Sequence, residues 1–77
     1  MDIHMTDVML HIDENLDKFQ RKSLENHMRG QIGVIGLGYH DHHPHLMIVE
    51  YDLDATTSME LLRSVTAKGL HAELIGL

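Results

Sequence analysis

The chain has 77 residues, a net charge of −6 with neutral histidines, and no cysteine. A chain of this size can bury one core, so we expect a single domain over residues 1–77, with residues 1–6 as a flexible N-terminus. The composition argues against disulfides, thiolate metal sites and phosphate-mediated binding of nucleic acid, and the absence of a signal peptide or membrane-spanning run favours a small soluble, cytoplasmic protein.

The first half of the chain predicts a strand, a helix and a second strand. Residues 7–12 alternate between apolar and other side chains, which is the period of a half-buried strand. Residues 13–15 supply turn and N-cap chemistry, and a helix is expected from Leu16 to Gly30 or Gly33. The expected buried stripe of this helix consists of Leu16, Gln20, Leu24 and Met28, with Phe19 beside it. Residues 34–39 predict a strand in which Gly36 and Gly38 mark a bulge.

The second half predicts a strand, a helix and a short last strand. Pro44 suits the second position of a turn that begins at His43. Residues 46–52 form the clearest strand pattern, with residues 47, 49 and 51 on one side. Thr57 and Glu60 have the spacing of a capping box, and Lys68-Gly69 is typical of a helix end. Residues 71–75 predict the last strand.

This order of elements predicts an α+β fold, the ferredoxin-like βαββαβ open-faced sandwich. Right-handed crossovers place two helices on one face of a four-stranded antiparallel sheet. The other face is left open. We expect it to be lined by Met9, His11, Ile48, Glu50, His71, Glu73 and Ile75.

The chain resembles the heavy-metal-associated (HMA) domain family over nearly all of residues 7–77. The similarity is carried by Val49-Glu-Tyr-Asp52, Thr57-Ser-Met-Glu-Leu-Leu62, Val65 and Lys68-Gly-Leu-His-Ala-Glu-Leu-Ile75, and by Leu24-Glu25 followed by Gly33-Val34. That family includes copper chaperones and the N-terminal modules of metal-exporting P-type ATPases. The resemblance therefore implies the ferredoxin-like fold and a link to cation transport.

The chain departs from the family at its metal site, a C-x-x-C pair at the start of the first helix. By the same spacing these degenerate positions are Asp17 and Gln20, and neither is a thiolate. Copper(I) requires soft sulfur ligands, whereas a carboxylate and an amide oxygen are hard, weak donors. Leu70 also replaces the usual aromatic residue. The family's copper-shuttling role is therefore not transferred.

Four of the eight histidines lie between positions 40 and 45, in the predicted hairpin. Imidazole is the commonest protein ligand of transition metals, and in an extended strand His40 and His42 share a side. The candidate metal ligands are His40, Asp41, His42, His43 and His45, and the ions they suit are Zn, Ni and Cu(II). The alternative interpretation is a polar turn whose histidines are only solvated.

A second candidate cluster lies on the open face. His11 and His71 are expected to neighbour one another on the first and last strands, with Glu50 or Glu73 as carboxylate partners.

Three functional hypotheses follow. The first is a metal-binding protein whose histidine-rich hairpin replaces the cysteine pair. The second is a metal-free module that binds a protein partner, or forms a homodimer, through the open face; the third is the N-terminal domain of a cation transporter. An enzyme is not expected, because the loop at residues 11–15 is acidic and lacks the arginine with which acylphosphatases of this topology hold phosphate.

Overall fold

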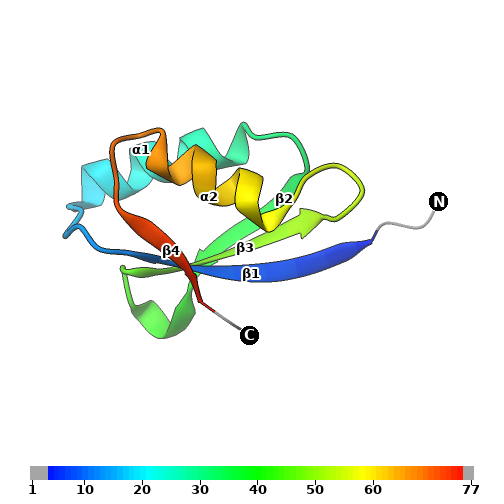
Figure 1. Cartoon of the computed structure of the whole chain (residues 1–77). Helices are drawn as coiled ribbons and strands as arrows, with labels where there is room; N and C mark the ends of the chain where they lie inside the picture. The colour runs from blue at the N-terminus through cyan, green and yellow to red at the C-terminus, as the bar shows by residue number, and fades with distance from the viewer. Residues whose placement is uncertain (1–3, 76–77) are drawn as a thin grey trace.

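Two helices cover one face of a four-stranded antiparallel sheet in the computed structural model, which describes residues 4–75 (Figure 1). The elements are β1 Met5–Ile12, α1 Lys18–Arg29, β2 Val34–Tyr39, the short 3-10 helix η1 His40–His42, β3 Leu46–Asp52, α2 Ser58–Thr66 and β4 Ala72–Ile75. This order confirms the predicted ferredoxin-like βαββαβ fold.

The strands lie in the order β2-β3-β1-β4, so β1 and β3 are central and β2 and β4 are edges. In β1, Val8, Leu10 and Ile12 are buried, whereas Met9 and His11 are only half-buried. This alternation turns one side of each strand toward the helices and the other toward the open face. The side predicted from the sequence is the buried one.

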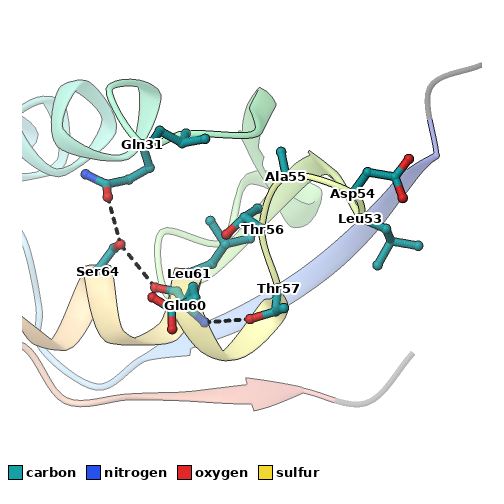
Figure 2. Close-up of a pocket in the computed structure, with 10 residues that line it drawn as sticks. Gln31, Leu53, Asp54, Ala55, Thr56, Thr57, Glu60, Leu61 and Ser64 are labelled. Carbon is teal, nitrogen blue, oxygen red and sulfur yellow. Dashed lines mark hydrogen bonds between the residues drawn. The ribbon is translucent and has the colours of Figure 1, made fainter. Parts of the chain in front are cut away.

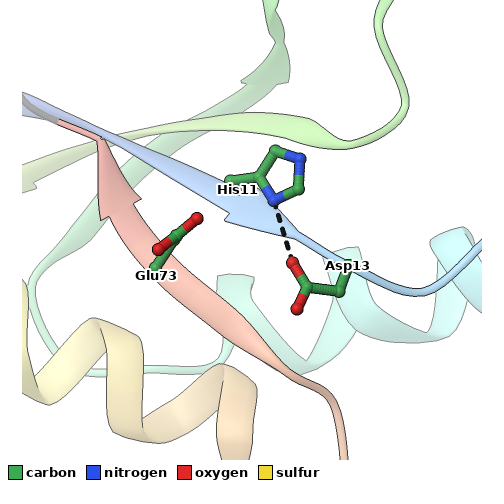
Figure 3. Close-up of side chains that lie close together, drawn as sticks. All are labelled: His11, Asp13 and Glu73. Atoms are coloured by element: carbon green, nitrogen blue, oxygen red, sulfur yellow. Dashed lines mark hydrogen bonds and ion pairs between the residues drawn. The ribbon is translucent and has the colours of Figure 1, made fainter.

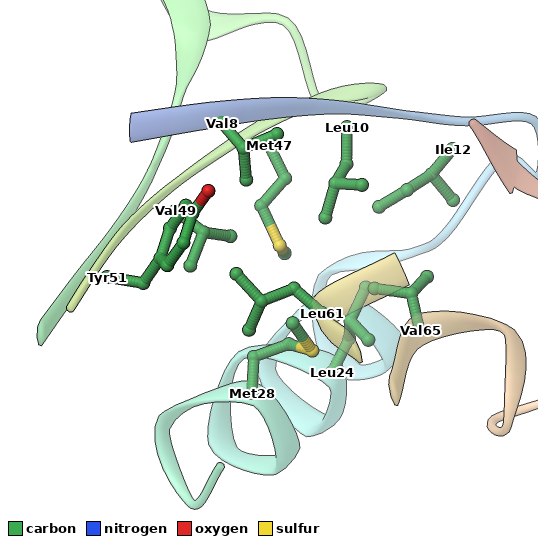
Figure 4. Packing of buried hydrophobic residues seen from close by; sticks show 10 residues of the cluster. All are labelled: Val8, Leu10, Ile12, Leu24, Met28, Met47, Val49, Tyr51, Leu61 and Val65. Carbon is green, nitrogen blue, oxygen red and sulfur yellow. The ribbon is translucent and has the colours of Figure 1, made fainter. Parts of the chain in front are cut away.

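The core lies between the helices and the sheet (Figure 4). The strands supply the buried residues Val8, Leu10, Ile12, Met47, Val49 and Tyr51, and the helices supply Leu24, Met28, Leu61 and Val65. Each helix thus contributes two residues from one stripe, as an amphipathic helix on a sheet requires.

Helix α1 begins later than predicted. Its N-cap is Asp17 rather than a residue of the 13–15 segment, so Leu16 lies outside the helix and is only half-buried. Leu24 and Met28 are buried as expected, but Gln20 is exposed and Phe19 is 83% exposed. The predicted stripe was wrong at its start, because Leu16 precedes the helix and the Gln20 side chain turns back to accept a hydrogen bond from the Asp17 amide. Gly30 ends the helix as a C-cap.

Helix α2 uses half of the predicted capping box. Thr57 Oγ1 accepts a hydrogen bond from the Glu60 amide at 3.2 Å. The Glu60 side chain does not return to the N-cap, because it pairs with Arg63 one turn further along. The helix ends at Thr66, and Gly69 takes a positive φ of 82° two residues past the Ala67 C-cap.

The ends of the sheet hold two further details. A register shift between Val34 and Gly36 confirms the predicted irregularity of the second strand next to Gly36, whereas Gly38 pairs with Ile48 in regular register. At the N-terminus β1 already begins at Met5, inside the stretch 1–6 that was expected to be flexible, while residues 1–3 of that stretch lie outside the described part. Within residues 4–75 neither helix is long and apolar enough to cross a bilayer.

Candidate functional site

The histidine-rich hairpin turns tightly rather than continuing as strands. Strand β2 stops at Tyr39, and residues 40–42 form a 3-10 turn in which Asp41 and His42 have positive φ values of 48° and 60°. The expectation that His40 and His42 share one side of an extended strand was therefore wrong. The predicted turn after His43 is confirmed, since the Leu46 amide donates to the His43 carbonyl at 3.1 Å.

His45 is anchored to the loop between β1 and α1. Its Nδ1 donates to the Ile12 carbonyl at 2.6 Å, and its Nε2 lies 2.9 Å from Oδ1 of Asn15. Its ring also stacks on that of His11, with the centroids 5.8 Å apart. Both ring nitrogens of His45 thus have partners already, and the residue joins the start of β3 to the end of β1.

The other hairpin candidates, His40, Asp41, His42 and His43, are exposed. They are not part of the group of ligand atoms that lies within 4.8 Å in the described residues. Metal binding by the hairpin stays a prediction, and it requires this turn to rearrange around the ion.

A preformed set of ligand atoms lies beside the hairpin, on the open face of the sheet (Figure 3). One ligand atom each from His11, Asp13 and Glu73 lies within 4.8 Å of the others. His11 ends the open side of β1, Asp13 follows that strand, and Glu73 stands opposite His11 on β4. His11 Nδ1 is 3.0 Å from Asp13 Oδ1. One imidazole and two carboxylates form a hard to borderline donor set, which suits divalent transition metals rather than copper(I).

Of the second predicted site, this cluster confirms Glu73 as the carboxylate neighbour of His11 and corrects the rest. The partner of His11 on β4 is Glu73, and neither His71 nor Glu50 joins it: Glu50 stands opposite Asp7 at the other end of β1. Asp13 was interpreted only as a turn residue. The spacing of His11 and Asp13, two residues apart, was the signal that both lie on the same side of an extended segment.

His71 instead forms an ion pair with Glu14, in the loop that follows β1. Its Nδ1 lies 2.7 Å from Glu14 Oε2, and its backbone amide donates to the same carboxylate at 2.9 and 3.0 Å. The side-chain and backbone hydrogen bonds from His71 lower the pKa of Glu14 below its ordinary value. The hydrogen bond and the charge of Glu14 raise the pKa of His71. The pair ties the β1–α1 loop to the start of β4.

Replacing Glu14 with glutamine tests this ion pair. Glutamine keeps an acceptor for the backbone amide but removes the charge, so we expect the pKa of His71 to fall toward its ordinary value in an NMR pH titration of its ring protons. Because the pKa of Glu14 is lowered in the folded state, its ionised carboxylate stabilises the fold above pH 4.5. This stabilisation is lost as pH falls through the folded-state pKa. The raised pKa of His71 stabilises it below pH 6.5 and loses this effect as pH rises through the folded-state pKa.

The stability difference between wild type and Glu14→Gln is therefore expected to be largest between about pH 4.5 and 6.5. Glu60→Gln, which removes an exposed carboxylate elsewhere, is the control and should leave the His71 titration unchanged. A His71 pKa that is the same in Glu14→Gln as in wild type contradicts the pairing.

Asp17 and Gln20, the two positions where the resemblance places the family's cysteines, cap the N-terminus of α1. Asp17 Oδ1 accepts from the Gln20 amide at 2.7 Å, and Gln20 Oε1 accepts from the Asp17 amide at 2.9 Å. This is a complete capping box. Both oxygens are engaged and both are hard donors, so these residues do not fit copper(I).

Asp17→Ala is expected to lower the free energy of unfolding by about 1 kcal/mol, because it removes the N-cap acceptor. Urea denaturation measures this change. Lys18→Ala, at the neighbouring exposed position, serves as the matched control and should change stability by less than about 0.5 kcal/mol. Equal stability of the two variants contradicts a structural role for the cap.

A pocket of about 440 Å³ lies at the other end of the molecule, where α2 begins (Figure 2). Some of its polar groups already contact one another: Ser64 Oγ shares its proton between Gln31 Oε1 at 3.0 Å and the Glu60 carbonyl at 3.1 Å. No imidazole lines it. The pocket therefore offers less for metal chemistry than the His11 cluster.

Two solved structures share this arrangement of helices and strands. Oxidized MerP from Ralstonia metallidurans CH34 superposes with a TM-score of 0.81 over 94% of this chain and 99% of its own, at 12% identity. A copper binding domain from HMA7, a P-type ATPase, also gives a TM-score of 0.81, over 91% of this chain and 93% of its own, at 12% identity. The fold is heavy-metal-associated-like.

At 12% identity these HMA-like neighbours establish the fold alone. No family model matches the sequence, and no curated protein matches it.

Proposed function

We propose that this chain reversibly binds a divalent transition-metal ion, Zn²⁺, Ni²⁺ or Cu²⁺, through imidazole and carboxylate ligands. The observation that carries the proposal is the cluster of His11, Asp13 and Glu73, whose ligand atoms lie within 4.8 Å of one another. Two regular strands hold two of these residues, so little order has to be gained on binding. Acid releases the ion, because imidazole must be neutral to act as a ligand.

The hairpin is the second source of ligands in this proposal. Residues 40–43 carry three imidazoles and a carboxylate, and the hairpin adjoins the cluster, because His11 pairs with Leu46 where β3 begins. Fixing an exposed turn costs about 1–2 kcal/mol per residue, so we expect the hairpin to bind more weakly than the cluster. His45 is left out, since both of its ring nitrogens have partners.

The two solved structures support this proposal through the fold that they share with this chain. One structure with the same fold is described as a copper binding domain of a P-type ATPase. The interpretation of this chain as the N-terminal domain of a cation transporter has the same support and stays a prediction. The donor set favours borderline divalent ions in place of copper(I).

Titration of ZnCl₂, NiCl₂ and CuCl₂ into tag-free protein, followed by calorimetry and amide NMR shifts, tests the proposal. We expect saturable binding that shifts residues at the ends of β1 and β4. The double variant His11→Ala/Glu73→Gln should weaken it by at least about 100-fold, since two side chains that bind the ion directly are lost and loss of a supporting group alone costs 10–100-fold. The matched control, His40→Ala/His42→Ala/His43→Ala, should change it by less than tenfold.

The outcomes distinguish whether the chain binds metal from where on the chain the metal binds. Millimolar affinity in wild type, or tight binding that survives in both variants, contradicts metal binding by these ligands. Binding that is lost only in the hairpin variant keeps the proposed function and moves the site to residues 40–43.

A further inference from the structure

The lysines and arginines are confined to one of the two layers of this molecule, whereas acidic side chains occur in both. All six lysines and arginines lie in the helical layer: Lys18, Arg21, Lys22 and Arg29 on α1, Arg63 on α2, and Lys68 just after α2. In the described residues, the lysine and arginine ion pairs are Arg29–Glu25 and Arg63–Glu60, each within one helix. The strands therefore carry no cation apart from histidine.

In the part of the chain that the structure describes, no lysine or arginine pairs with the carboxylates on the open face of the sheet. Asp7 and Glu50 stand directly opposite one another on β1 and β3, and Glu73 stands opposite His11 on β4. All three carboxylates are exposed. Like charges placed directly opposite each other destabilise a strand pair, so this arrangement is not explained by folding.

Between these charges an apolar strip crosses the sheet. Met9 pairs with Ile48 on one side and with Ile75 on the other, so three apolar side chains stand in a row on β3, β1 and β4. They are half-buried, and both helices lie on the opposite side of the sheet (Figure 1). The Asp7–Glu50 pair flanks the strip on one side, and His11 and Glu73 flank it on the other.

We propose that the open face binds a basic amphipathic helix of a protein partner. A helix that lies across the strands would follow the strip, which spans two strand spacings, about 10 Å or nearly two helical turns. The flanking acidic side chains stand two residues away along the strands, about 7 Å. An aliphatic stripe would cover Met9, Ile48 and Ile75, while lysine or arginine on both flanks of the helix would reach the carboxylates.

The charges argue against the other occupants of this face. A homodimer through two open faces would bring two sets of Asp7, Glu50 and Glu73 together with no lysine or arginine between them. Nucleic acid and anionic lipid would be repelled in the same way. Of these possible partners, only a basic amphipathic one would both bury the apolar strip and form ion pairs with the carboxylates beside it. The docking surface does not depend on metal binding, because Asp7 and Glu50 lie outside the cluster.

The test uses a synthetic amphipathic helix with leucine on one side and lysine on both flanks, titrated into isotope-labelled protein with EDTA present. We expect amide shifts to concentrate at Met9, Ile48 and Ile75 and affinity to fall with added salt. Asp7→Asn/Glu50→Gln should weaken binding at least about tenfold. The matched control, Glu25→Gln/Glu60→Gln on the helices, should leave the affinity unchanged. Because removing a like-charge pair does not destabilise the sheet, lost binding will not reflect unfolding, which thermal denaturation checks.

Several outcomes would overturn the proposal. One is equal binding of a matched peptide with glutamate in place of lysine; another is amide shifts confined to α1 and α2. A third is full affinity in Asp7→Asn/Glu50→Gln. Sedimentation of the protein alone is a further test. A concentration-dependent dimer that the variant Ile48→Asp dissociates would mean that a second copy of this chain covers the open face, and it would contradict the proposal of a basic partner.

Discussion

Gly33→Ala is expected to lower the free energy of unfolding by about 2–4 kcal/mol. Gly33 has a φ of +86°, where a Cβ atom is strained. An added Cβ would also lie 2.8 Å from Thr56 Cγ2 and 3.0 Å from the Ala55 Cβ, so the β3–α2 loop has to move. The Gly33 carbonyl accepts from the Asp52 amide at 2.9 Å, and this contact would shift too. Urea denaturation measures the loss.

Gly69→Ala is the matched control for this prediction. Its φ is nearly the same, +82°, but nothing lies within 4 Å of an added Cβ. Only the backbone strain remains, which costs about 1–2 kcal/mol. The difference between the two variants measures the close approach of the two loops, and equal losses in both would contradict that packing.

Leu10→Ala is expected to cost about 3–5 kcal/mol, because Leu10 is fully buried on the central strand β1 and its truncation leaves a cavity between the sheet and the helices. The norm for a chain of this length is only about 4–12 kcal/mol in total. The variant should therefore unfold at a much lower temperature and urea concentration, as followed by circular dichroism.

Met9→Ala is the control for Leu10→Ala, since the two residues are neighbours on β1 that face opposite sides of the sheet. Met9 is half-buried on the open face, so we expect a loss of about 1 kcal/mol or less. A loss comparable to that of Leu10→Ala would mean that the open face is packed as tightly as the core, which contradicts its assignment as an unoccupied surface.

The strands were predictable because their pattern is local. Residues 8, 10 and 12, and residues 47, 49 and 51, alternate with a period of two, and each set is buried. Helix α2 was predictable for the same reason, since Thr57 caps it and Leu61 and Val65 follow at helical spacing. The order of these elements left few topologies, and the ferredoxin-like one is observed.

The candidate sites were harder to predict because they depend on register and turn geometry. The sequence does not show that His11 stands opposite Glu73 rather than His71, since that pairing is set by where β4 begins. It also does not show that residues 40–42 form a 3-10 turn. The helix start was misplaced because Asp13, Asn15 and Asp17 are all acceptable N-caps, and only the reciprocal hydrogen bonds with Gln20 distinguish Asp17.

The capping box of Asp17 and Gln20 also has a consequence for oxidation chemistry. This helix start is held by a carboxylate and an amide, groups that neither lose electrons nor form covalent bridges, and the chain has no thiol elsewhere. The β1–α1 loop should keep the same shape in oxidising and reducing surroundings. No thiol–disulfide exchange can switch it.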